Sequence, residues 1–223
     1  MNKNLFLDAG GVILNEQQFE AKSAEIITEL ISKYKKYTLE DYKNDAEEAV
    51  CRYVPRVYDY ILYKNIKNIE LFSILRNQYK ASINSNENFE LTDGIVMFLQ
   101  TFSQHYKIGI LGQYGENFKE FLNTNGLLKY FTYSETNDNY NITKPDPRYF
   151  EAILKTCKCN PQESVMIGDR IDKDIIPAKM IGMKTVRIKT GLHINQEARI
   201  PVEIADYTVN SLNEISVEMI EKL

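Results

Sequence analysis

The stretch of sequence that decides the fold is VMIGDRIDKDIIPAKMIGMKTV, which occupies residues 165–186. Residues 164–167 form a short, mostly apolar run typical of a buried strand, and Gly168 and Asp169 break it. Residues 174–181 have the pattern of a helix, and residues 185–188 form a second short strand. A strand, a helix and a second strand in this order predict a βαβ unit, and therefore a parallel sheet.

The same alternation continues on both sides of this unit. Further strands are predicted at residues 4–7, 107–111, 130–134 and 207–209, and helices at residues 95–102, 118–122 and 146–155. Strands that alternate with helices predict a mainly parallel sheet with helices packed on its faces. The predicted fold class is therefore α/β, with a three-layer Rossmann-like core.

One long segment, residues 15–89, interrupts the alternation and has a different character. It contains no glycine, and its apolar residues recur at the spacing of amphipathic helices. One such stripe consists of Phe19, Ile26, Ile27, Leu30 and Tyr34. We therefore expect two domains, an α/β core formed by residues 1–14 and 90–223 and an inserted all-helical cap formed by residues 15–89.

The bulk properties exclude several classes of protein. A formal net charge of −4 over 223 residues argues against a nucleic-acid partner that is bound through its phosphates. The apolar runs are too short to span a bilayer, and the N-terminus has no signal-peptide pattern. We expect a cytoplasmic protein with neither a membrane nor a nucleic acid as partner.

The cysteines and histidines give no sign of a thiol, zinc or triad chemistry. Cys51, Cys157 and Cys159 are an odd number without a disulfide framework, so ordinary reduced thiols are expected. His105 and His193 are isolated from acidic or nucleophilic partners at catalytic spacing, which argues against a Ser-His-Asp triad.

Distinctive polar residues follow the predicted strands, at the sheet edge where open parallel sheets bind ligands. They are Asp8, Gly112, Gln113, Lys144, Asp169, Asp172 and Asp174. Two carboxylates and a lysine that converge there could hold a hard divalent cation and a phosphoryl group. A carboxylate can also act as a nucleophile and form an acyl phosphate.

The order of these residues resembles the motifs of the haloacid dehalogenase (HAD) superfamily of hydrolases. The segments that carry the resemblance are LFLDAGGVIL (5–14), KIGILGQ (107–113), TKPDPRYF (143–150), the opening stretch (165–186) and ADYTVNSLNEI (205–215). The fourth of these is the most specific, and the resemblance covers the whole predicted core. The helical insert is similar to the type-one cap of subfamily IA, which serves such enzymes as a lid.

The resemblance implies a role for each site residue and Mg²⁺ as the cofactor. Asp8 would be the nucleophile, and Asp8, the backbone carbonyl of Gly10 and Asp169 would hold the metal ion. Lys144 would neutralise charge on Asp8 and on the transferring group, and Asp174 would orient Lys144 or a water on the metal. The reaction implied is hydrolysis of a small phosphorylated metabolite.

Two positions depart from the pattern of the family's phosphatases. Gly10 stands where those enzymes carry a second aspartate, which protonates the leaving oxygen and later activates water. Loss of such a general acid–base typically slows a reaction by about 10²–10⁴-fold. Gly112 stands where a serine or threonine binds the phosphoryl group, so Gly112 and Gln113, together with Lys144, are the phosphate-binding candidates that remain.

These departures leave three hypotheses open. The first is a phosphatase, made slow by Gly10, that works through an aspartyl-phosphate at Asp8. The second is a phosphonate or haloacid hydrolase of the same fold, although dehalogenases of this type lack the metal-binding aspartate that Asp169 retains here. The third is a catalytically impaired protein that binds a ligand or a partner. The sequence indicates neither the particular substrate nor an oligomeric state.

Overall fold

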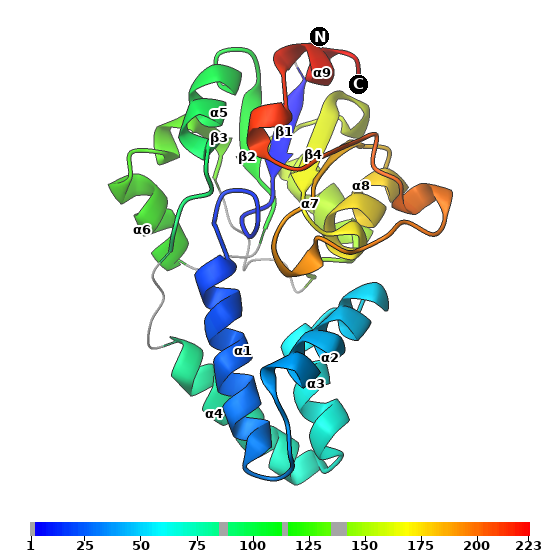
Figure 1. The fold of residues 1–223 in the computed structure, drawn as a ribbon. Helices are drawn as coiled ribbons and strands as arrows, with labels where there is room; N and C mark the ends of the chain where they lie inside the picture. Colours follow the sequence, from blue (N-terminus) through cyan, green and yellow to red (C-terminus); the bar gives the residue numbers. More distant parts are fainter. Residues whose placement is uncertain (1–2, 85–88, 113–115, 135–141) are drawn as a thin grey trace. The chain divides into compact units, whose positions relative to one another are not determined.

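The computed structural model describes residues 3–84, 89–112, 116–134 and 142–223. The chain divides into two compact units, which are coloured along the sequence in Figure 1. One unit contains residues 1–15, 89–190 and 198–223, and the other contains residues 16–88 and 191–197. None of the described helices is both long enough and apolar enough to cross a lipid bilayer.

The first unit is built on a parallel sheet. Its six strands, as far as the chain is described, lie in the order β3-β2-β1-β4-β5-β6. The strands are β1 (Asn4–Leu7), β2 (Lys107–Ile110), β3 (Phe131–Tyr133), β4 (Ser164–Gly168), β5 (Lys184–Ile188) and β6 (Tyr207–Val209). The two central strands, β1 and β4, are buried along their whole length, as expected for a sheet covered on both faces.

Apolar side chains of these strands alternate between two hydrophobic layers. Leu5 and Leu7 face a cluster that includes the helix α5 (Ile95–Phe102), whereas Phe6 faces a cluster that includes α7 (Pro147–Cys157) and Ala178. Because successive residues of a strand point to opposite faces, one strand packs against helices on both sides. The predicted α/β fold with a three-layer Rossmann-like core is confirmed. Its other helices are α6 (Glu116–Thr124), α8 (Ile176–Met180) and α9 (Val217–Glu221).

The strand order reverses between β1 and β4. From β1 the sheet extends through β2 to β3, and from β4 it extends through β5 to β6. In open α/β sheets this reversal leaves a crevice beyond the carboxyl ends of the two central strands, where ligands bind. Leu7 pairs with Ile167, and the backbone N–H of Asp8 donates to the Ile167 carbonyl at 2.9 Å, so both strands end side by side at that point.

One helical prediction differs in detail from the structure of this unit. The helix predicted from residue 174 is preceded by a π-helical turn, Ile171–Ile175, and α8 begins at Ile176. The closing segment forms a 3₁₀ turn, Leu212–Glu214, and the last helix, α9, begins only at Val217, where the side chain of Ser216 caps it. Serine is a favoured N-cap because its hydroxyl accepts a bond from an otherwise unpaired N–H.

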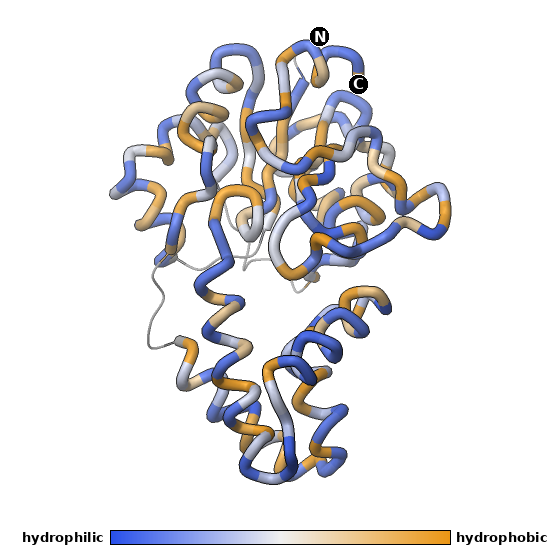
Figure 2. The backbone as a smooth tube through the Cα atoms, in the orientation of Figure 1, coloured by the Kyte–Doolittle hydropathy of each residue, from blue (hydrophilic) through white to orange (hydrophobic). Residues whose placement is uncertain are grey.

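The second unit is helical. Its described helices are α1 (Gln17–Ser32), α2 (Leu39–Cys51), α3 (Val57–Ile66) and α4 (Ile69–Asn84). Their apolar sides form one buried cluster that includes Ile27, Leu30 and Leu75, and Figure 2 shows hydrophobic and hydrophilic residues mixed along each helix. The predicted stripe is buried only at its centre, because Phe19 and Tyr34 at its ends are exposed.

A short segment from the C-terminal half of the chain completes this helical unit. Residues 191–197 belong to it, although the sequence-based division assigns them to the core. Leu192 packs against the helical cluster, and its backbone N–H donates to the Glu20 carboxylate at 2.7 Å. At the other end of the segment, the Tyr53 hydroxyl donates to the Glu197 carbonyl at 2.6 Å. The segment has no helical periodicity, so this packing could not be predicted from the sequence.

A charged network joins α2 to α3. The Glu48 carboxylate accepts hydrogen bonds from Lys64, from the Tyr60 hydroxyl at 2.7 Å and from Arg52 at 2.9 Å. The bonds from Lys64, and then those from Tyr60 and Arg52, lower the pKa of Glu48 to about 2. The ionised form is therefore favoured by the folded state.

We expect Glu48→Gln to remove a pH-dependent part of the stability. The pKa of Glu48 is lower in the folded chain than in the unfolded one, so its contribution is present above pH 4.5, the ordinary glutamate value, and is lost as pH falls towards 2. The melting temperatures of wild type and variant should therefore differ more at pH 7 than at pH 3. Glu47→Gln, at an exposed neighbouring position, is the control. An equal difference at both pH values would contradict the assignment.

Candidate active site

The loop after β1 folds back tightly and places Asp8 at the sheet edge. Gly11 donates its N–H to the Leu14 carbonyl at 2.9 Å, and Leu14 donates to the Ala9 carbonyl at 2.8 Å. Gly11 has a φ of +69°, a conformation that favours glycine, and a Cβ there would lie 3.0 Å from Cγ of Asp169. Glycine at this position therefore lets the loop of β1 approach the aspartate that follows β4.

The end of β4 is shaped by a second close approach. A Cβ on Gly168 would lie 2.5 Å from Cβ and Cγ of Asp174, so the absence of a side chain makes room for that aspartate. The next residue, Asp169, is buried. Its backbone carbonyl accepts a hydrogen bond at 3.2 Å from Nε of Arg187, which lies on β5 beside Gly168. These contacts fix the backbone from which the Asp169 carboxylate projects.

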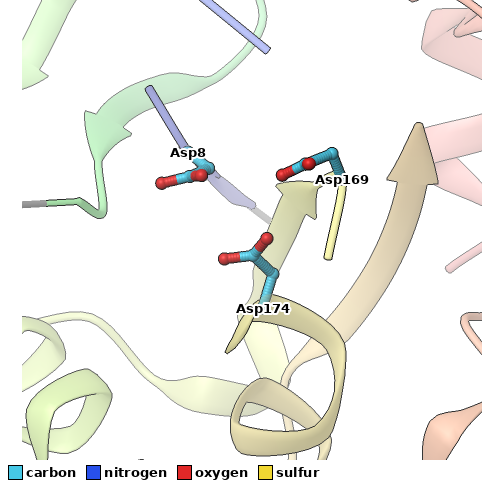
Figure 3. A group of neighbouring side chains, drawn as sticks. All are labelled: Asp8, Asp169 and Asp174. Atoms are coloured by element: carbon cyan, nitrogen blue, oxygen red, sulfur yellow. The ribbon is translucent and has the colours of Figure 1, made fainter. Parts of the chain in front are cut away.

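Three carboxylates converge beyond the two central strands. Each of Asp8, Asp169 and Asp174 offers an oxygen, and these oxygens all lie within 4.8 Å of one another. Figure 3 shows the side chains of Asp8 and Asp169 at the ends of their strands and that of Asp174 rising from the helical turn toward them. Like charges this close repel, so the arrangement requires cations.

Lys144 supplies one cation. Its ammonium lies 2.8 Å from Oδ1 of Asp8 and 2.7 Å from Oδ1 of Asp174, and the lysine side chain is 9% exposed. Burial by itself lowers the pKa of Lys144, but the charges of Asp174 and Asp8 raise it by more, so the lysine stays protonated. Oδ2 of Asp174 accepts the backbone N–H of Arg170 at 3.0 Å, so both oxygens of this carboxylate are held by the protein.

The remaining donor set fits a divalent cation. With Asp174 held by Lys144 and Arg170, the carboxylates of Asp8 and Asp169 are those best placed to bind an ion. Carboxylate oxygens are the ligands that Mg²⁺ prefers, and three carboxylates against one ammonium leave the group with net negative charge. Among the described residues, the acidic cluster contains no cysteine or histidine, as a site for a hard cation requires.

The other predicted residues contribute no side chain to this acidic cluster in the part of the chain that the structure describes. Gly112 lies buried beyond the end of β2, and its carbonyl accepts the hydroxyl of Tyr149 at 3.1 Å. Gln113 lies outside the described residues.

Asp172 does not join the acidic cluster, and both its oxygens accept bonds from the Arg170 guanidinium, at 3.1 Å and 2.6 Å. Gly10 is buried and contributes only backbone atoms.

Several residues beside the site were not singled out by the sequence. They are Tyr149, Arg170, Lys173 and Arg187. Lys173 and Arg170 lie inside the quoted motif, but lysine and arginine in a loop are usually solvated. Arg187 carried a detectable signal, because a charged residue in the apolar run 185–188 has to find a buried partner.

The family of the chain follows from a match over most of its length. The model of the haloacid dehalogenase-like hydrolase family matches residues 6–188. The chain therefore belongs to the haloacid dehalogenase-like hydrolases, as its motifs predicted.

Curated relatives include several enzymes named glyceraldehyde 3-phosphate phosphatase. The one from Methanocaldococcus jannaschii is 39% identical over 98 residues, which are 44% of this chain and 41% of that protein. The one from Methanothermobacter thermautotrophicus is 26% identical over 208 residues, which are 92% of this chain and 83% of that protein. The chain thus spans about two fifths of the first relative's length and most of the second's.

Solved structures with the same fold include two bacterial proteins. A haloacid dehalogenase-like hydrolase from Streptococcus pneumoniae superposes with a TM-score of 0.71 at 14% identity, covering 96% of each chain. A haloacid dehalogenase-type protein from Bacillus subtilis, whose crystal structure contains magnesium, gives a TM-score of 0.69 at 18% identity, again over 96% of each chain. At these identities the likeness establishes the fold.

Proposed function

We propose that this protein is a Mg²⁺-dependent phosphatase that hydrolyses a small phosphorylated metabolite through an aspartyl-phosphate at Asp8. The observation that carries the proposal is the convergence of Asp8, Asp169 and Lys144 at the point where the strand order reverses. The names of the curated relatives support a small phosphate ester, such as a triose phosphate, as the substrate.

In the first step, Asp8 acts as the nucleophile. The Lys144 ammonium holds Oδ1 of Asp8 at 2.8 Å and so fixes the orientation of the carboxylate before substrate arrives. An oxygen of Asp8 attacks phosphorus, the ester P–O bond breaks, and its electrons leave with the alcohol oxygen. Mg²⁺ held by Asp8, Asp169 and the carbonyl of Gly10 would supply positive charge against the phosphoryl oxygens.

In the second step, water attacks the phosphorus of the acyl phosphate, which releases inorganic phosphate and restores the Asp8 carboxylate. Lys144 is protonated in the free site, because Asp174 and Asp8 hold its pKa above the ordinary value. Asp174 therefore acts through Lys144 and not on the substrate. We further propose that the helical residues 15–89, joined by residues 191–197, form the cap that selects the substrate and excludes water.

Gly10 limits both steps. The leaving oxygen departs without a proton from this position, and the attacking water finds no base there. We therefore expect esters with good leaving groups to react faster than alkyl phosphates. The same glycine favours a second candidate function, a protein that binds a phosphorylated ligand with little or no turnover. Haloacid hydrolysis is less well supported, because Asp169 is retained.

The test is a panel of aryl and alkyl phosphate esters assayed with and without Mg²⁺. Activity should disappear in a chelator and return with Mg²⁺. Asp169→Asn should weaken Mg²⁺ binding, measured directly by calorimetry, and lower the activity, whereas the exposed Asp93→Asn should change neither. Wild-type protein that binds Mg²⁺ and phosphate esters without releasing phosphate would favour the binding function over the phosphatase.

A further inference from the structure

Lys173 lies inside the turn that connects two of the site's carboxylates. It is the third residue of the π-helical turn Ile171–Ile175, between Asp169 and Asp174. The Arg170 carbonyl accepts the N–H of Asp174 at 3.0 Å and that of Ile175 at 3.2 Å. The bond from Ile175 spans five residues, as in a π-helix, where an α-helical bond would span four. Turns of this kind accommodate an extra residue in a helix and occur frequently at functional sites.

Lys173 is half-buried, and its charge interacts with charged groups of the site. Burial, followed by repulsion from Arg170, lowers its pKa, and the charges of Asp172, Asp174 and Asp8 act in the opposite direction. Lys173 is therefore partly stripped of water and lies within electrostatic range of the nucleophile Asp8. Removing an ammonium from water is costly unless an anion compensates for the loss.

The nearby carboxylates are already held by other cations. The Asp172 carboxylate accepts hydrogen bonds from Nε and Nη2 of Arg170, and Lys144 bridges Asp8 and Asp174. In the part of the chain that the structure describes, the Lys173 ammonium forms no hydrogen bond or ion pair. This ammonium thus differs from that of Lys144, because it is not committed to a protein carboxylate.

We propose that Lys173 binds the phosphoryl group of the substrate. The inference rests on the proposed phosphatase function and adds a substrate-contacting residue to it. A phosphoryl dianion is the anion that the site has to accommodate, and a charged donor is a stronger partner for it than a neutral hydroxyl. Lys173 thereby supplies positive charge in a site where Gly112 has no side chain with which to bind phosphate.

The test measures two ligands separately, inorganic phosphate and Mg²⁺, by isothermal titration calorimetry on the full chain. Lys173→Met should weaken the binding of phosphate, in the presence of Mg²⁺, by about 10–100-fold, as for the loss of a charged hydrogen bond. The affinity for Mg²⁺ alone should stay the same or increase, because a positive charge near Asp8 has been removed. Lys173→Arg should retain most of the phosphate affinity.

Lys155→Met is the matched control, because it removes the same charge from an exposed position on α7 and should leave both affinities unchanged. If Lys173 only stabilised the turn, its replacement would weaken Mg²⁺ and phosphate together and lower the melting temperature. That result, or unchanged phosphate binding in Lys173→Met beside an active wild type, would overturn the assignment of Lys173 alone. A wild type that neither binds nor releases phosphate would overturn the proposed function itself.

Discussion

Asp8→Asn is expected to reduce the Mg²⁺-dependent release of phosphate by at least about 10⁴-fold, the scale seen when a catalytic nucleophile is removed. Asparagine has nearly the same shape as aspartate, so the backbone turn around Gly11 should persist. The amide is a poor nucleophile, and it cannot form the acyl phosphate. It also removes one of the two carboxylates that neutralise Lys144.

The measurement should include trapping of the intermediate as well as steady-state turnover. Wild type quenched in acid during reaction with a labelled ester should carry covalent phosphate, and Asp8→Asn should carry none. The exposed Asp93→Asn should behave as wild type in both assays. Covalent phosphate on Asp8→Asn would show that another residue is the nucleophile.

Gly10→Asp is expected to raise the turnover of alkyl phosphates by about 10²–10⁴-fold, the usual contribution of a general acid–base. Gly10 is not in the left-handed backbone region, in contrast to Gly11, so a side chain brings no strain of that kind. The new carboxyl can protonate the leaving oxygen, which matters most when the alcohol is a poor leaving group. Aryl phosphates should gain much less, and the dependence of rate on leaving-group pKa should become flatter.

Gly10→Asn separates proton transfer from the effect of filling space. It introduces a side chain of nearly the same size that cannot donate a proton to the leaving group in this way, and it should therefore not accelerate alkyl phosphates. Equal gains in the two variants would argue against proton transfer as the cause. Unchanged rates in Gly10→Asp, beside rapid alkyl phosphate hydrolysis by wild type, would mean that another residue already supplies the proton.

The parallel sheet, and the approach of Asp8 to Asp169, could be predicted from the sequence. In a parallel sheet all strands end at one edge, so Asp8 and Asp169, each placed directly after an apolar run, have to come near one another. Lys144 follows another predicted strand, which also placed it near this edge, but its contact with Asp174 could not be predicted because 30 residues separate the two in the chain.

The features that could not be predicted are the hydrogen-bond pattern of one turn and contacts between segments that are distant in the chain. The π-helical turn differs from an α-helix by one hydrogen-bond step, and the apolar spacing of residues 174–181 does not distinguish the two. Residues 191–197 pack on the helical unit through contacts that include the Glu20 carboxylate, Leu192 and the Tyr53 hydroxyl, and such scattered contacts leave no periodic pattern in the sequence. Arg187 satisfies a backbone carbonyl, and that partner becomes visible only when β4 and β5 are paired.

The contribution of residues 191–197 to the helical unit bears on how such a cap could be exchanged between enzymes. The chain passes between the two units at four points, near residues 15/16, 88/89, 190/191 and 197/198, and not at two. A chimaera that replaced only residues 16–88 would leave Leu192 without its apolar neighbours and the buried His193 and Gln196 in foreign surroundings. A graft that keeps the recipient properly folded would have to transfer both segments together, as a discontinuous cassette.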